Sequence, residues 1–410
     1  MRQLNKILFV LYFLVLFFYG LLIKFLYGTF LFNYIKFLPE IIIVLFLITC
    51  FFIAKGKKGF TLLDASLMVV IVTISIASIF SATSFKYVAV YIRDFFIPIL
   101  TLVLLKNLKI DNRMIRFYYK ALANIGILFL VASIYFGYKQ WSSSYEYTSN
   151  WYLNKVIYGY DEYSSIKISE ASGRLRALGL VGNSAKYGFY SIFSFIFITL
   201  YYKRFHHYFF SFIFALANIW FSTNKTALVA LLVIALAELI LFYYKGKHRL
   251  IIFVFSFVLA CIVAGMYIPL HMDKLRSVGE RFELWSDYDY ISLENLIVGI
   301  DLYTHFGLEN GWMAVVDNAY LFGFAAFGVV SFIFFLFYCL KLSTKTKYLI
   351  VLSIMFVLLG LTTNIFSGRS FFTIYCLLAG IELSKDSDLN LQDKRYELFP
   401  SSTRYCKMDG

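Results

Sequence analysis

Long apolar runs recur along most of this 410-residue chain, and short basic segments separate them. Hydrophobic residues make up 61% of the sequence, which is far more than a soluble domain contains. An apolar run of about 18–25 residues is long enough to cross the hydrocarbon core of a bilayer as a helix. The sequence therefore predicts an all-α polytopic membrane protein. About twelve transmembrane helices are expected, over residues 5–27, 37–54, 63–82, 87–105, 121–138, 185–202, 208–222, 226–244, 250–269, 318–340, 348–366 and 370–383.

The formal charge of +14 is explained by where the basic residues lie. If the N-terminus is cytoplasmic, every short loop on the inner side contains Lys or Arg, as the positive-inside rule requires. Both termini are then expected in the cytoplasm, and nucleic acid is not an expected partner. The five cysteines lie in apolar runs or in the C-terminal tail, so neither a disulfide framework nor a thiolate metal site is predicted.

Two connections are much longer than the others, at about 139–184 and 270–317, and both fall on the outer side. Long polar loops on a rigid scaffold are frequent locations of function. The sequence contains no soluble domain and no clear internal repeat. Residues 1–383 are therefore expected to form one transmembrane domain, followed by a polar cytoplasmic tail over residues 384–410.

The first long loop contains two arginines, Arg174 and Arg176, close to the predicted membrane surface. Arginine binds phosphate oxygens through paired hydrogen bonds, so this pair suits a lipid-linked phosphate. Anchoring to lipid headgroups explains the pair equally well. Gly179, Gly182 and Asn183 follow, but no strand is predicted before them and the Walker lysine spacing is absent, so they do not form a nucleotide-binding loop.

Lys225 stands at the outer start of a predicted helix, where Ser222 or Thr223 is the expected cap. A cation is unfavourable there, because the helix dipole is positive at its N-terminus. A bound anion would offset this cost, and extension of the lysine to headgroups is the simpler alternative. Arg93 and Asp94 lie inside a predicted span, and each is expected to have another partner, in a structural ion pair or in the substrate.

The second long loop contains the other candidate groups. Arg276 and Arg281 are suited to phosphate. Asp287 and Asp289 have the acid-x-acid form of many metal-dependent glycosyltransferases, although chance acids in a polar loop explain them more simply. Asp317 precedes Asn318 where this loop re-enters the membrane. Asp317 is either a helix cap or a carboxylate at the mouth of an active site, and the two roles are compatible.

Four short stretches resemble motifs of the O-antigen polymerase and O-antigen ligase superfamily of bacterial inner membranes. They are "GRLRALGLVGNSAKYG", "STNKTALVAL", "SVGERFELW" followed by "IVGID", and "VDNAYLFGFAAFG". The chain departs from these motifs at three positions. Lys225 replaces an arginine, Asp301 replaces a glycine, and Asp317 stands where the ligases have a histidine. The last departure favours an O-antigen polymerase of the Wzy type over a ligase.

This resemblance implies a metal-independent membrane glycosyltransferase without a cofactor. It would join undecaprenyl-diphosphate-linked oligosaccharide repeat units into O-antigen or capsular polysaccharide on the periplasmic side of the inner membrane. A chain-length regulator protein and a flippase are the implied partners, besides the lipid bilayer. The expected catalytic residues are Asp317, Arg281 and Lys225, and the expected substrate-binding residues are Arg174, Arg176, Arg276, Asn183 and Asn318.

Other functions remain open. An O-antigen ligase shares the motifs, and a lipid-linked oligosaccharide flippase would also have about twelve spans. A flippase needs charges along a central path, however, and few charges lie clearly within the predicted spans; they are Glu40, Arg93, Asp94 and Glu238. A metal-dependent glycosyltransferase would use Asp287 and Asp289.

Overall fold

Helices account for nearly all the secondary structure of the described residues. The computed structural model describes residues 1–26, 29–69, 72, 93, 96–142, 170–171, 174–175, 177–240, 329–343, 345–360 and 371–385. The strands in this part of the chain are two short antiparallel pairs. β1 (Gly56–Lys57) pairs with β2 (Leu108–Lys109), and β3 (Glu170–Ala171) pairs with β4 (Arg174–Leu175). The predicted all-α fold is thus confirmed for this part.

Most of the described helices coincide with predicted spans. They are α3 (Leu38–Ile53), α6 (Ile97–Lys106), α7 (Asn112–Ser142), α11 (Ser184–Tyr202), α12 (Phe205–Ser222), α13 (Lys225–Glu238), α19 (Val329–Ser343), α20 (Lys347–Gly360) and α21 (Phe371–Leu383). Residues 62–69 are helical too. The described residues also form the 3₁₀ helices η1 (Phe30–Asn33), η2 (Ile35–Phe37) and η4 (Gly179–Val181). The predicted span 250–269 and the predicted loop 270–317 lie outside the described residues.

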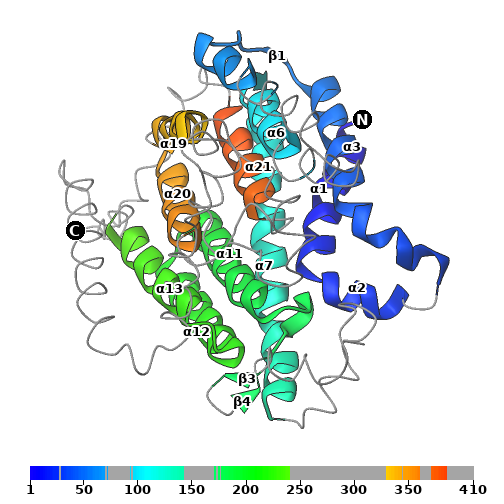
Figure 1. Ribbon diagram of the computed structural model, residues 1–410, viewed down its shortest axis with the longest axis vertical. Coiled ribbons are helices and arrows are strands. Elements are labelled where there is room, and N and C mark those ends of the chain that lie inside the picture. Colours follow the sequence, from blue (N-terminus) through cyan, green and yellow to red (C-terminus); the bar gives the residue numbers. More distant parts are fainter. Residues whose placement is uncertain are drawn as a thin grey trace, which may run out of the picture.

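The first predicted span is not one continuous helix. α1 (Arg2–Phe17) and α2 (Tyr19–Leu26) meet at a bend of 85°. Phe18 between them has φ −110° and ψ 23°, which are not helical values. The expectation of a single helix over residues 5–27 is therefore wrong. Figure 1 shows α2 crossing the end of α1 instead of extending it.

By length and composition, α7 is the one described helix that could cross a membrane by itself. The bent pair of α1 and α2 could form a second span. At about 1.5 Å per residue, the 31 residues of α7 extend about 46 Å, which exceeds the hydrocarbon thickness of about 30 Å. The other apolar helices are shorter within the described residues, so the twelve-span topology stays a prediction.

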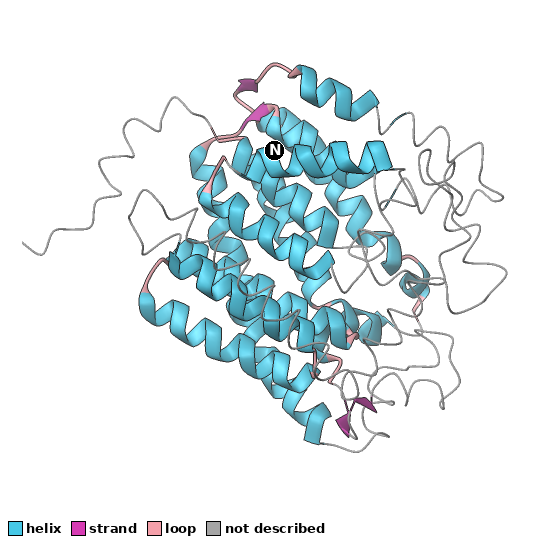
Figure 2. Ribbon diagram, turned by 60° about the vertical axis from the view of Figure 1, so that its left-hand side comes forward, coloured by secondary structure: helices cyan, strands magenta, loops and turns pink. Residues whose placement is uncertain are grey.

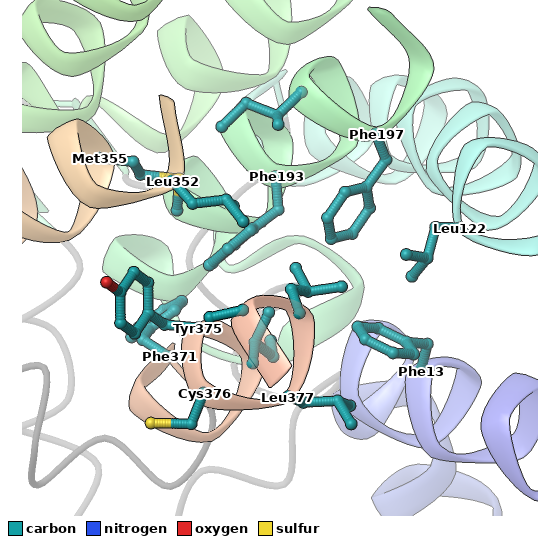
Figure 3. Packing of buried hydrophobic residues seen from close by; sticks show 14 of the residues in the cluster. Phe13, Leu122, Phe193, Phe197, Leu352, Met355, Phe371, Tyr375, Cys376 and Leu377 are labelled. Carbon is teal, nitrogen blue, oxygen red and sulfur yellow. The ribbon is translucent and has the colours of Figure 1, made fainter. Parts of the chain in front are cut away.

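The helices pack side by side in a bundle (Figures 1 and 2), and Figure 1 shows α11 near its centre. α11 packs against α7, α12 and α13, and most of its side chains are buried. Aromatic rings form much of the core (Figure 3). Phe193 of α11 stacks on Phe371 of α21 with ring centroids 5.9 Å apart, and Phe13 of α1 meets Phe197 edge-on at 6.0 Å. A helix that is apolar all round belongs in the interior of a bundle.

Each end of the bundle is held together by its own set of contacts. Figure 1 shows β1 and β3 at these opposite ends. At the basic end, defined by residues 55–64, 106–111 and 382–385, Lys58 Nζ donates to the carbonyl oxygens of Leu383 and Lys385 at 2.7 and 2.8 Å. At the loop end, defined by residues 137–142, 177–188 and 218–227, Ala177 N–H donates to the Phe221 carbonyl oxygen at 3.0 Å. The charge pattern of the sequence predicts that the loops of the basic end lie inside and those of the loop end outside.

Candidate functional site

Only part of the expected site lies within the described residues. Asn183 is described with its side chain, whereas Arg174 in β4 and Lys225 at the start of α13 are described by their backbone position alone. The other candidates lie outside the described residues; they are Arg176, Arg276, Arg281, Asp317 and Asn318, together with Asp287 and Asp289 of the metal-dependent alternative. The described part of the candidate site is therefore the loop end.

Two of the four motifs meet at this end. Asn224 Nδ2 of "STNKTALVAL" donates to the carbonyl oxygen of Ala185, which lies 39 positions earlier in the motif "GRLRALGLVGNSAKYG". Gly188 sits directly against α13, since a Cβ on Gly188 would lie 2.9 Å from the Cβ of Ala227. The N-terminus of α11 is therefore adjacent to the N-terminus of α13.

Each of these two helices begins with an asparagine cap. Asn183 Oδ1 accepts a hydrogen bond from Lys186 N–H, and Asn224 Oδ1 accepts one from Ala227 N–H, both at 3.0 Å. The expected cap of α13 by Ser222 or Thr223 is wrong, because the Ser222 hydroxyl donates to the carbonyl oxygen of Ile219. Asparagine is a preferred cap, so the residue type already favoured Asn224. The cap uses only Oδ1 of Asn183, and its substrate-binding role stays a prediction.

The loop end combines two helix N-termini with basic residues. Lys186 lies in the first turn of α11, and Lys225 is the first residue of α13. The free N–H groups of a helix N-terminus carry a partial positive charge, which the lysines increase. Arg174 belongs to the hairpin that leads into the same loop. This concentration of positive charge is suited to an anion.

The loop between β4 and α11 is fixed by buried contacts. Gln140 Oε1 of α7 accepts hydrogen bonds from the N–H groups of Leu178 and Gly179, both at 3.0 Å. Gly179 has φ +60°, and a Cβ there would lie 2.5 Å from the ring of Tyr187. The Tyr187 hydroxyl lies 2.5 Å from Oδ1 of Asn218 on α12. The glycine and the tyrosine of the motif thus have structural roles.

Backbone N–H groups of this loop are engaged within the protein. Ala177 N–H donates to the Phe221 carbonyl oxygen, and Gly182 N–H donates to the Leu178 carbonyl oxygen at 3.1 Å. The N–H groups of Leu178 and Gly179 donate to Gln140. These four groups are therefore not available to a ligand at the loop end.

Sequence reasoning missed the strain at Thr223. This residue lies one position before the Asn224 cap and has φ 50°, in the left-handed region. That conformation costs an L-residue about 1–2 kcal/mol and is rare for a β-branched side chain. Strained backbone is found preferentially at functional sites. No sequence pattern indicates it, because threonine is an unusual residue at such a position.

No protein-family model matches this chain, and neither does any curated protein sequence. The resemblance to O-antigen polymerases therefore depends on the motifs and on the predicted topology. Among the described residues, no group of three or more His, Cys, Asp and Glu could hold a metal ion.

Two charges within predicted spans have partners on other helices. Arg93 Nε lies 3.8 Å from Oε1 of Glu40 in α3, so the expectation of a partner for Arg93 is confirmed as an ion pair with this helix. Glu238 Oε1 at the end of α13 accepts a hydrogen bond from the Thr199 hydroxyl of α11 at 2.8 Å. The second contact connects α11 with α13. Asp94 lies outside the described residues.

Proposed function

We propose that this protein is a polysaccharide polymerase of the Wzy type. It joins undecaprenyl-diphosphate-linked oligosaccharide repeat units on the periplasmic side of a bacterial inner membrane. One observation carries the proposal: two motifs that are distant in the sequence lie together at the adjacent N-termini of α11 and α13. Each N-terminus is capped by an asparagine, and Lys186 and Lys225 lie in the first turns of the two helices. A lipid diphosphate is the anion that such an end would bind.

The exposed surface supports a membrane location. Large apolar side chains are exposed on α3, α7 and α12; examples are Ile48, Phe52, Leu128, Val131, Phe209 and Phe210. Soluble monomers rarely expose contiguous apolar faces of this kind. Lipid would cover these faces in a polytopic protein with both termini in the cytoplasm.

In the proposed reaction, a sugar hydroxyl of one repeat unit attacks the anomeric carbon that carries the lipid diphosphate of another. A new glycosidic C–O bond forms, and the bond from the anomeric carbon to the diphosphate oxygen breaks with its electron pair. The hydroxyl proton passes to Asp317 or to the departing diphosphate. Arg174, Arg176, Lys225, Arg276 and Arg281 would stabilise the charge that develops on the leaving group.

The contacts of the charges within predicted spans favour a polymerase over a flippase. Arg93 is paired with Glu40, and Glu238 is hydrogen-bonded to Thr199. A flippase needs charged groups that are available to its cargo along a central path. Charges that hold helices together do not provide such a path.

Complementation of a strain that lacks its own polymerase tests the proposal. We expect Lys225→Ala and Arg174→Ala, at matched protein levels, to lower long-chain polymer on the order of a hundredfold, because each removes a charge from the leaving-group site. Lys57→Ala is the matched control, since Lys57 is an exposed cation at the basic end.

Three outcomes would contradict parts of the proposal. If Lys225→Ala produces the full range of polymer lengths, this lysine does not stabilise charge in the reaction. If Asp317→Asn produces normal polymer, Asp317 is not the base. A deletion strain that carries no single repeat unit on its lipid A core would indicate a flippase, because loss of a polymerase still leaves single units there.

A further inference from the structure

Gly20 of α2 touches the backbone of the loop that precedes α11. A Cβ on Gly20 would lie 2.7 Å from Gly182 N, 2.8 Å from the carbonyl carbon of Val181 and 2.9 Å from the carbonyl oxygen of Leu180. All three atoms belong to the backbone, so a side-chain rotation cannot make room for even one methyl group. A residue larger than glycine at position 20 would therefore displace this loop.

The position of α2 makes this contact possible. The chain turns by 85° after α1, and α2 then packs against η4. The buried residues of α2 are Gly20 and Ile23, whereas Phe25 is strongly exposed. The buried side of this helix is thus the side that supports the loop.

We propose that Gly20 is a positioning residue for the diphosphate site, a role that depends on the function proposed above. Through Gly20, α2 completes the support that Gln140, Tyr187 and Phe221 give to the loop from the other helices. The loop connects β4, which contains Arg174, with the Asn183 cap of α11. Its fixed conformation sets the spacing between the arginine strand and the two helix N-termini, and that spacing must match the diphosphate.

Binding of farnesyl diphosphate to the purified full chain in lipid nanodiscs tests this role, with farnesol as the uncharged probe. We expect Gly20→Ala to weaken farnesyl diphosphate binding about tenfold or more, because displacement of binding groups by about 1 Å is costly. Farnesol binding should stay unchanged, since farnesol lacks the diphosphate that the loop positions. A general loss of packing would affect both probes alike.

Gly380→Ala is the matched control. A Cβ on Gly380 would lie 2.7 Å from the Cβ of Leu105, so this variant crowds a helix contact between α21 and α6 instead of the loop. We expect it to retain the preference of the wild type for farnesyl diphosphate over farnesol, even if its melting temperature falls as much as that of Gly20→Ala.

The outcomes separate this role from the proposed function. If Gly20→Ala binds farnesyl diphosphate as the wild type does, Gly20 has no positioning role. If the wild type itself does not prefer farnesyl diphosphate to farnesol, the proposed diphosphate site fails. Should Gly20→Ala not fold, Ile23→Val loosens the same side of α2, and we expect about a two- to fivefold loss of affinity. Unchanged affinity in that variant would overturn the role of α2.

Discussion

Asp111 connects two cytoplasmic loops of the proposed topology at the basic end. Its Oδ1 accepts a hydrogen bond from Arg113 N–H at 3.0 Å, and its Oδ2 lies 3.3 Å from Lys55 Nζ. The N–H of Arg113, together with Lys55, lowers the pKa of the Asp111 carboxyl. A carboxylate with a lowered pKa stabilises the folded state above its ordinary pKa of about 3.9. This contribution is lost as the pH falls through the lowered pKa.

We expect Asp111→Asn to lower the free energy of unfolding by about 0.2–1 kcal/mol near neutral pH, because Asn can still accept the hydrogen bond from Arg113 N–H at the start of α7 but lacks the charge. Thermal unfolding of the purified protein at a series of pH values measures this effect. The difference between wild type and variant should shrink as the carboxylate of the wild type becomes protonated. Lys55→Gln is the matched control, since it removes the same ion pair from the other side. A difference that does not change with pH would contradict the expectation.

Asp64 ties three helices together at the same end. Asp64 belongs to the helix at residues 62–69, and its side chain is fully buried. Lys106 Nζ at the end of α6 lies 2.5 Å from Asp64 Oδ1, and the Tyr338 hydroxyl of α19 donates to the same oxygen at 2.8 Å. The Thr61 hydroxyl donates to Oδ2 at 2.8 Å. This buried charge is therefore paired and hydrogen-bonded, as its desolvation requires.

We expect Lys106→Met to lower the free energy of unfolding by about 3–5 kcal/mol, because it leaves the Asp64 carboxylate buried without its cation. Addition of Asp64→Asn should recover part of this loss, since the uncompensated charge is then gone. Unfolding in detergent or nanodiscs measures both variants. Lys57→Met, at an exposed lysine of β1, should change the free energy of unfolding by less than about 0.5 kcal/mol. Strictly additive effects of the two substitutions would contradict the pairing.

Local sequence patterns predicted the helices but not their junctions. Apolar runs located α3, α11 and α12 to within a few residues, because a span must be continuously apolar. No proline near Phe18 indicates the turn between α1 and α2. It is accompanied by the contact of Gly20 with Gly182, which joins positions far apart in the sequence. Such a contact is a property of tertiary packing and leaves no local signal.

In the candidate site too, the sequence indicated individual residues but not the contacts between them. Residue types indicated Arg174, Asn183 and Lys225 as candidates, and the distribution of Lys and Arg placed their loops on one side. The bond from Asn224 to Ala185 brings two motifs together, and it follows from the packing of α11 against α13. The strain at Thr223 is likewise a consequence of how α12 and α13 join, and the sequence alone does not reveal it.

The whole molecule is connected end to end by α7, so this helix offers the most direct test of the topology. Arg113 is exposed beside the basic end, and Ser142 is exposed at the loop end. In a chain whose five cysteines are replaced, we expect Ser142→Cys to react with a membrane-impermeant maleimide in intact cells. Arg113→Cys should react only after the inner membrane is permeabilised, because about 44 Å of helix separates the two positions across the bilayer.

Lys57→Cys is the matched control for this labelling, since the charge pattern predicts that Lys57 lies on the same side as Arg113. Its reactivity should follow that of Arg113→Cys in every condition. Reaction of both Arg113→Cys and Ser142→Cys in intact cells would contradict a membrane crossing by α7. A reversed pattern would retain the crossing but place the loop end in the cytoplasm. A polymerase acting on the periplasmic side could then not have its diphosphate site at the paired N-termini of α11 and α13.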